Sequence, residues 1–323
     1  MTETGAPLAG TVTGGKSIEP LGVETGPARR RRRRFGRDPE RPKYTWKEAG
    51  LAALFLAPSL AVFVVFAYAP FIRIIGWGTY ESRANGTRYE SVGLQQYKDV
   101  LTGSDFWNGV WHSLQFVIVT VPAGIVLGAV LAVVANRQLR GMKVFQTIFA
   151  STIASSVAVT SVIFFFLINP VVGWFKVDWL DNPSTAMWAV ALPSVWQNLG
   201  LSFVIVLAGL QAVPEEVLEA ATLDGYGPVR RFLRIIVPLI SPVLMFLAVV
   251  LVVFGFQAYA QIDFLTSGGP AGSTETLVFK IFQKNTPDTI TVGSVMSVGL
   301  FALTFFATLL QFTILDRRVH YGR

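Results

Sequence analysis

The chain has 323 residues, of which 52% are hydrophobic and 15% charged, with a formal net charge of +7, no cysteine and two histidines. Of its 27 basic and 20 acidic residues, 11 and 6 fall in the first 48 positions. Soluble domains carry about 25% charged residues, so the remaining body cannot cover itself with polar surface. The composition excludes a soluble globular protein, a disulfide framework, a thiolate-ligated zinc site and a histidine-built metal centre.

Residues 1–48 are rich in Gly, Pro, Thr and Arg and show no apolar period, so they are predicted to form a disordered, basic cytoplasmic tail. Six consecutive arginines run from Arg29 to Arg34. Next to a membrane span, such a run is typical of a polybasic segment held by anionic lipid. We therefore expect membrane lipid, and no nucleic acid, as the partner of the tail.

Residues 10–17, GTVTGGKS, fit the G-x-x-x-x-G-K-[ST] pattern of a phosphate-binding loop. That loop works only between a buried strand and a helix, which aim its amides at the phosphates. No apolar strand precedes it here, and Ile18-Glu19-Pro20 cannot open a long helix. We interpret the match as accidental and expect this chain to bind no ATP and no other cofactor.

Six apolar stretches without Asp, Glu, Lys or Arg follow the tail. Each is long enough for a helix, at 1.5 Å per residue, to cross a hydrocarbon core about 30 Å thick. Residues 49–323 are therefore predicted to be one all-α, polytopic membrane domain with six transmembrane helices. The spans are expected near residues 49–70, 112–135, 147–168, 186–210, 236–260 and 290–314.

The orientation of the spans follows from the density of Lys and Arg. The short loops after the second and fourth spans each hold three of these residues, as Arg137, Arg140 and Lys143, and as Arg230, Arg231 and Arg234. Cytoplasmic loops carry an excess of Lys and Arg. Both termini are therefore predicted to be cytoplasmic.

The predicted cytoplasmic segment 211–238 shows signals for two short helices. Pro214 and the two glutamates after it favour the first turn of a helix. Asp224-Gly225 ends that helix, and Pro228 begins a second. Two short helices would offer a compact docking surface for a partner protein, although a solvated loop with interfacial helices would give the same pattern.

The same segment resembles the EAA motif, EAA-x3-G-x9-I-x-L-P, of the permease subunits of ATP-binding-cassette importers. Val237 stands in the Leu position of the motif. The resemblance implies a MetI/MalF-like permease fold, and it implies that the segment is a coupling helix that sits in a groove of an ATPase subunit. The implied ATPase-coupling residues are Glu219, Ala220, Ala221, Asp224, Gly225 and Pro238.

Two further segments extend the resemblance to the sugar and glycerol-3-phosphate (MalF/UgpA-like) branch of this family. Residues 93–97, GLQQY, followed by Phe106-Trp107, resemble its G-L-x-N-Y…F-W segment, with Gln96 in place of Asn. Residues 266–277 resemble its external T-x-G-G-P…T loop. The resemblance implies that this loop faces the binding protein through Gly268, Gly269 and Pro270.

Within the branch, the nearest likeness is to permeases for sn-glycerol 3-phosphate and glycerophosphodiesters such as glycerophosphocholine. It is carried by residues 167–170, 224–232, 238–242 and Val319-His320-Tyr321. A permease for a disaccharide or oligosaccharide is the alternative. A channel or membrane enzyme is the rival from another class, and it is disfavoured because the spans hold no carboxylate, no cysteine and no filter-like sequence.

Neutral polar and aromatic residues lie in or near the third, fourth and fifth spans. These residues could form hydrogen bonds between helices, as polar residues in membrane proteins do. They could instead line a translocation pathway suited to polyols, and both interpretations stay open. The pathway candidates are Asn169, Trp196, Gln197, Asn198, Gln257, Tyr259 and Gln261. The predicted spans hold no cation for a phosphate, so a binding protein or a partner subunit would have to select an anionic substrate.

The resemblance also implies an assembly in the plasma (inner) membrane of a prokaryote. Besides this chain, the assembly would hold a second permease subunit, a homodimer of ATPase subunits that binds ATP and Mg, and an extracytoplasmic substrate-binding protein. Closure of the ATPase dimer would switch the spans between two states of access. This chain is expected to have no catalytic site and to hold no metal.

Overall fold

The computed structural model describes residues 46–316, except positions 84, 87, 137–140 and 176–177. The chain divides into two compact units, residues 1–58 and 59–323. Several predicted features lie outside the described residues: the tail with its arginine run and phosphate-loop look-alike, Arg137 and Arg140 after the second span, and Val319-His320-Tyr321. The described part of the first unit, residues 46–58, is helical.

The first predicted span is helical from Trp46 to Trp77, and a hairpin follows it. In order, its segments are α1 (Trp46–Phe63), a π-helical segment (Val64–Tyr68), α2 (Ala69–Trp77), β1 (Tyr80–Arg83) and β2 (Arg88–Ser91). The two strands pair antiparallel with Tyr80 opposite Ser91. They make up the only sheet among the residues that the structure describes.

Helices make up most of the remaining chain. Its first half contains α3 (Gln95–Thr102), α4 (Ser104–Ala135), α5 (Met142–Ala150), a 3-10 turn (Ser151–Ala154), α6 (Val157–Ile168) and α7 (Ala186–Gln211). Its second half contains α8 (Glu215–Leu223), α9 (Pro228–Arg231), a π-helical segment (Phe232–Ile236), α10 (Val237–Leu239), α11 (Ser241–Phe256), α12 (Ala260–Leu265), α13 (Leu277–Gln283) and α14 (Ile290–Asp316).

The all-α prediction is confirmed, and the spans fall into two kinds. Four helical stretches are long and apolar enough to cross a membrane, and the number rises to six if each of two bent helix pairs is one span. The pair Met142–Ala154 and Val157–Ile168 is bent by 106°, and the pair Pro228–Leu239 and Ser241–Phe256 by 75°. The third and fifth predicted spans are therefore bent.

Local chemistry accounts for both bends. At the first bend, Ser155 Oγ donates to Thr152 O at 2.6 Å, and Thr152 Oγ1 donates to Phe149 O at 3.0 Å. Hydroxyls that bond to nearby main-chain carbonyls offer the backbone an alternative to the regular helix. At the second bend, Pro242 stands in the first turn of α11, where a residue without an N–H group is tolerated.

The core of the second unit forms where α4, α7 and α11 meet. Small residues allow the close approach of α4 and α7, since a Cβ added at Gly128 would lie 2.4 Å from Ser202 Cβ. Gly124, one turn earlier on α4, faces the Ser202 hydroxyl and Leu251 of α11. In lipid, helices associate through such packing of small residues rather than through the hydrophobic effect.

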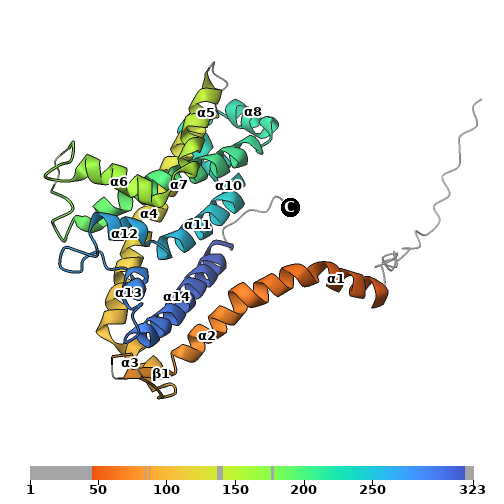
Figure 1. Cartoon of the computed structure of the whole chain (residues 1–323). Coiled ribbons are helices and arrows are strands. Elements are labelled where there is room, and N and C mark those ends of the chain that lie inside the picture. Colours follow the sequence, from red (N-terminus) through yellow and green to blue (C-terminus); the bar gives the residue numbers. More distant parts are fainter. Residues whose placement is uncertain (1–45, 84, 87, 137–140, 176–177, 317–323) are drawn as a thin grey trace, which may run out of the picture. The chain divides into compact units, whose positions relative to one another are not determined.

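Within the second unit, α5 and α8 lie at one end, and α3 and β1 lie at the other (Figure 1). α8 belongs to the predicted cytoplasmic segment 211–238, whereas α3 belongs to a predicted external loop. The spans between them therefore separate the two segments in space, as the predicted topology requires.

A short helix, α13, was not among the predicted elements. It packs against α4 and α14. Leu277 N donates to Ser113 Oγ of α4 at 2.9 Å, and a Cβ at Gly109 of α4 would lie 3.1 Å from Leu277 Cα. The glycine therefore lets the start of α13 lie directly on α4.

Candidate functional site

The predicted coupling segment begins with α8, whose end is fixed by a Schellman motif. Tyr226 N donates to Ala221 O at 3.0 Å, and Gly225 N donates to Thr222 O at 3.1 Å. Gly225 has φ +77°, in the left-handed region that the motif needs. The prediction that Asp224-Gly225 ends this helix is confirmed.

Side-chain contacts then fasten α9 to α8. Arg231 Nη1 donates to Thr222 Oγ1 at 2.9 Å. The guanidinium carbon of Arg230 lies 4.8 Å from the centre of the Tyr226 ring, within the range of a cation–π contact. These contacts join the two short helices into one unit, which we call the α8–α9 knob (residues 215–231).

The surface of the α8–α9 knob is mixed in character. Ala221 is buried, whereas Glu219, Ala220 and Asp224 are exposed. The side chain of Leu223 at the tip is 88% exposed. Glu219 makes no ion pair with any of the described residues. The knob therefore exposes both charged and apolar groups, as a surface that binds in the groove of a partner protein would.

Pro238, the last residue of the predicted motif, lies beyond the knob in α10. It is partly buried, and its carbonyl oxygen accepts a hydrogen bond from Ser241 Oγ at 2.7 Å. Ser241 is the first residue of α11. Pro238 therefore lies at the 75° bend that connects the knob segment to the fifth span.

Three pathway candidates bond to the protein itself. Gln197 Nε2 donates to Ser155 O at 2.9 Å, at the first bend. Gln261 is buried and donates from Nε2 to Ser194 Oγ at 2.9 Å. Asn169 Oδ1 accepts from the main-chain N–H groups of residues 171 and 172, at 2.9 Å each. The interpretation as interhelical hydrogen bonding describes the contacts of Gln197 and Gln261, whereas those of Asn169 close a local turn.

The other four pathway candidates are Trp196 and Asn198 of α7, and Gln257 and Tyr259 beyond the end of α11. The Tyr259 ring stacks on Phe282, with centres 4.1 Å apart, and Trp196 contacts Phe164 edge-on at 6.3 Å. Asn198 is half-buried, and Gln257 is exposed at the end of α11. Gln257 and Tyr259 are only two residues apart, but the seven candidates as a set do not converge on one cavity of the described chain.

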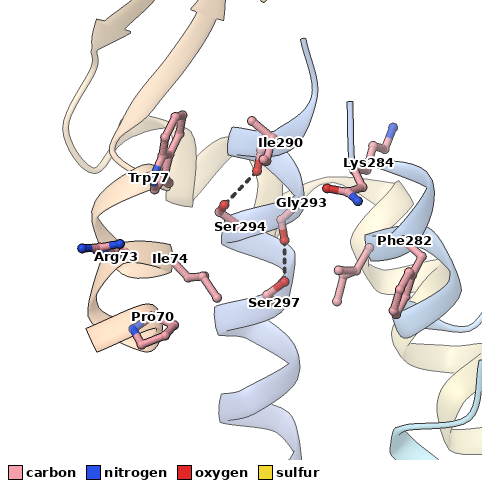
Figure 2. A pocket seen from close by; sticks show the side chains of 12 residues that line it. Pro70, Arg73, Ile74, Trp77, Phe282, Lys284, Ile290, Gly293, Ser294 and Ser297 are labelled. Carbon is pink, nitrogen blue, oxygen red and sulfur yellow. Dashed lines mark hydrogen bonds between the residues drawn. The ribbon is translucent and has the colours of Figure 1, made fainter. Parts of the chain in front are cut away.

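A groove of about 460 Å³ lies between α2, α13 and α14. Ser294 Oγ donates to Ile290 O, and Ser297 Oγ donates to Gly293 O, both at 2.8 Å and within α14 (Figure 2). The charged ends of Arg73 and Lys284 lie at the margins. No pathway candidate lines this groove.

The loop expected to face the binding protein is held by its two framing threonines. Thr266 Oγ1 lies 2.8 Å from Thr274 Oγ1, and Thr274 Oγ1 donates to Gly269 O at 2.8 Å. Gly268 has φ +86°, and a Cβ there would lie 2.5 Å from the Phe279 ring. The T-x-G-G-P…T pattern therefore encodes a tightly closed loop that lies on α13.

A second segment that is predicted to be external is fastened by the residue that departs from the family pattern. Gln96 of α3 is buried, and its Nε2 donates to Thr291 Oγ1 at 3.0 Å. Thr291 belongs to the first turn of α14. The glutamine that replaces the usual asparagine therefore ties α3 to the sixth span.

An ion cluster that the sequence analysis missed lies beneath the closed loop. Lys280 of α13 is only 7% exposed. Its Nζ bonds Asp105 Oδ1 of α4 and lies 2.8 Å from Glu275 Oε2. Burial alone would lower the pKa of Lys280, but the hydrogen bonds to the two carboxylates outweigh it and raise the pKa. The lysine therefore stays charged, and its stabilising contribution is lost only as the pH rises through that raised pKa.

Known proteins resemble the chain over most of its length. Residues 124–321 match the family described as binding-protein-dependent transport system inner membrane component. The sn-glycerol-3-phosphate transport system permease protein UgpA of Salmonella choleraesuis (strain SC-B67) is 31% identical over 282 residues, which cover 84% of this chain and 96% of the relative. UgpA of Yersinia pestis bv. Antiqua (strain Antiqua) is 31% identical over 294 residues, which cover 88% and 99%.

Among solved structures, a bacterial alginate ABC transporter in complex with a periplasmic protein bound to an alginate pentasaccharide contains a similar chain. The TM-score is 0.71 at 17% sequence identity, and the match covers 86% of this chain and 98% of that one. At this identity the likeness shows the fold, which is that of an ABC importer permease.

Proposed function

Because this chain belongs to the family of binding-protein-dependent transport system inner membrane components, as an ABC importer permease without a catalytic site of its own, we propose that it forms half of the translocation pathway of an importer for sn-glycerol 3-phosphate and glycerophosphodiesters. The partners are a second permease subunit, a homodimeric ATPase that binds ATP and Mg, and an extracytoplasmic binding protein. They correspond to UgpE, UgpC and UgpB. Both termini lie in the cytoplasm.

The observation that carries the coupling part of this proposal is the α8–α9 knob. Its residues are fixed to one another by the Schellman motif and the Arg231 bond. Its charged and apolar surface groups are exposed. A rigid element that leaves a partner surface open suits the transmission of a rigid-body movement from the ATPase to the spans.

The proposed route of this movement runs from the knob into α11. Residues 228–239 lead directly from the knob to the 75° bend before Ser241. α11 packs against α4, α7 and α14. Closure of the ATPase dimer on ATP would thus move α11 within the core of the second unit. The inward-open and outward-open states of the spans would then differ in how α11 packs against its neighbours.

The substrate proposal is supported by the UgpA relatives, whose names refer to sn-glycerol 3-phosphate transport. A disaccharide or oligosaccharide permease is the alternative within the same family. Binding calorimetry on the binding protein encoded with this chain would separate the two, with glycerol 3-phosphate, glycerophosphocholine and maltose as ligands. Binding of maltose alone would overturn the substrate proposal.

The subunit proposal has its own experiment. We expect the tagged chain, purified from membranes, to bring the ATPase and the second permease with it. In proteoliposomes, the complex should take up substrate only with ATP on the side of the ATPase and loaded binding protein on the other side. Purification of the chain without an ATPase, or uptake that needs no ATP, would contradict it.

A further inference from the structure

The Lys280 ion cluster joins the start of α4 to the closed loop and to α13, which follows that loop directly but is far from α4 in the sequence. Asp105 is in the first turn of α4, Glu275 is in the closed loop (residues 266–276), and Lys280 is in α13. Asp105 and Lys280 are separated by 175 positions. The single buried ammonium group therefore connects the closed loop to the outer end of a 32-residue helix.

Glu275 is held on several sides, which makes the connection rigid at the loop. Its carboxylate binds Lys280, and its main-chain oxygen lies 3.2 Å from His112 Nδ1 of α4. A Cβ at Gly268 would lie 2.9 Å from its Cγ, and one at Gly272 would lie 3.5 Å from its carboxylate. A displacement of the closed loop therefore moves Glu275 as well.

The other end of the connection is equally fixed. Asp105 begins α4, and the same helix reaches Gly124 and Gly128, where it packs against α7 and α11 in the core. Pro122, which has no N–H group, interrupts the hydrogen bonding of α4 locally, but the helix stays continuous from Ser104 to Ala135 and connects Asp105 to both glycines. A pull on Asp105 therefore reaches the core of the spans.

Stability alone does not explain why charges are used at this position. Taking the lysine ammonium out of water is costly, and a well-packed apolar residue often stabilises a protein as much as a buried charge with its partners does. The side chains of Asp105 and Glu275 are still 50% and 29% exposed, so binding of a partner on the loop can alter their pairing with Lys280.

We propose that Lys280 is a positioning residue that couples the docking of the binding protein on the closed loop to a movement of α4. The inference rests on the proposed importer function. When a loaded binding protein docks, the Asp105–Lys280–Glu275 cluster would transmit the displacement of the closed loop to the outer end of α4. ATP hydrolysis itself does not depend on the cluster.

The experiment uses the complete complex with its ATPase, assayed with and without loaded binding protein. We expect Lys280→Met to leave basal hydrolysis near normal and to reduce stimulation by the binding protein about tenfold, within the usual range of a coupling between two sites. Lys280→Arg, which keeps the cation, should restore part of the stimulation. Lys98→Met removes an exposed lysine of α3 and is the matched control, with normal stimulation expected.

A neutral triple variant separates coupling from charge balance. The variant Asp105→Asn/Glu275→Gln/Lys280→Met removes the cation and both carboxylates together. If the cluster only balanced charge, this variant would be stimulated normally. We expect the triple variant to remain poorly stimulated, at normal subunit stoichiometry. Normal stimulation of the triple variant would overturn the inference.

Asp105→Asn keeps the experiment decisive if Lys280→Met does not assemble. Asp105 is half exposed, and in this variant Lys280 keeps Glu275 as its partner. Stimulation of the Asp105→Asn complex should then fall below that of the wild-type complex, though by less than tenfold, and an unchanged value would overturn the inference. A wild-type complex that no binding protein stimulates would instead overturn the proposed function.

Discussion

The side-chain amide of Gln197 donates a hydrogen bond to the main-chain carbonyl oxygen of Ser155 at 2.9 Å, at the point where the third span bends by 106°. A bend leaves carbonyl groups without a helical partner, and unpaired carbonyls are costly in lipid. Three residues further along α7, a Cβ at Gly200 would lie 2.3 Å from Thr152 Oγ1 and 2.8 Å from Phe149 O. α7 therefore supports the bend with one polar side chain and one glycine.

Gln197→Leu should weaken the bend. We expect a loss of about 1 kcal/mol, the scale of one hydrogen bond between membrane helices, with slower transport and a normal amount of protein in the membrane. Thermal unfolding and uptake of the purified complex measure both effects. Asn198→Leu, at the neighbouring half-buried position, is the control and should change stability less. A transport defect in Gln197→Leu without any loss of stability would favour the pathway interpretation.

Gly128→Val should disturb the contact between α4 and α7. The new side chain would begin 2.4 Å from Ser202 Cβ and 3.0 Å from the Ser202 carbonyl carbon. Overpacking of this kind costs about 1–3 kcal/mol, so the folded chain should decline in membrane fractions. Gly76→Val, in helix α2 with nothing within 4 Å of its Cβ, controls for the helix propensity of valine. Equal abundance of the two variants would contradict the packing argument.

The spans without bends were predictable from hydropathy to within a few residues, with two exceptions: the first runs seven residues beyond its predicted end, to Trp77, and α4 begins eight residues before its predicted span. Its first two turns carry the charged Asp105 together with Phe106 and Trp107, so a search for charge-free apolar runs begins the span too late. The bend between α5 and α6 was not foreseen, because serine and threonine hardly interrupt an apolar run. Their effect depends on hydroxyl bonds to the backbone and on support from Gln197.

The candidate sites divide in the same way. Gly225 was predictable because a helix end with a glycine has a local signature, and its φ of +77° follows from that signature. The Lys280 cluster was not predictable, because its partner Asp105 is 175 positions away and nothing local connects the two. The pathway candidates were identified by residue type alone, and residue type does not reveal that Gln197 and Gln261 have partners inside the protein.

Deletion of residues 1–28 should leave transport intact. The segment lies outside the described residues, and the sequence around its phosphate-loop look-alike predicts neither the strand nor the helix that a nucleotide site needs. Lys16→Ala in the full chain should leave transport equally unchanged. The deletion is chosen to end before the arginine run, so that the run stays next to the first span. Uptake at measured membrane abundance checks both. Lost uptake in Lys16→Ala at normal abundance would show that the look-alike has a function.

The predicted topology has a direct test at the C-terminus. A reporter that is active only in the cytoplasm should be active when fused after Arg323, and one that is active only outside should be silent. The reason is the density of cations in the loops after the second and fourth spans. A fusion after Ser267, in the closed loop, should give the opposite pair of results. Activity of the external reporter after Arg323 would contradict the orientation.

Gly225→Val tests whether the turn of the α8–α9 knob matters for coupling. A Cβ added at Gly225 or at Gly227 would have nothing within 4 Å of it, but only Gly225 has a positive φ. Valine at φ +77° costs about 1–2 kcal/mol, whereas Gly227, at φ −65° and ψ 160°, has a conformation that valine adopts readily. The two variants add the same side chain and differ in backbone strain alone.

We expect Gly225→Val to reach the membrane, because the knob projects from the spans, and to lose stimulated ATP hydrolysis or the ATPase subunit itself. Gly227→Val should behave close to wild type. Glu219→Lys reverses an exposed charge on α8 without touching the turn, so a defect there would point to contact with the ATPase rather than to the shape of the knob. ATPase activity with and without loaded binding protein, together with subunit stoichiometry, measures each outcome. Normal stimulation, stoichiometry and uptake in both Gly225→Val and Glu219→Lys would mean that coupling runs through another segment.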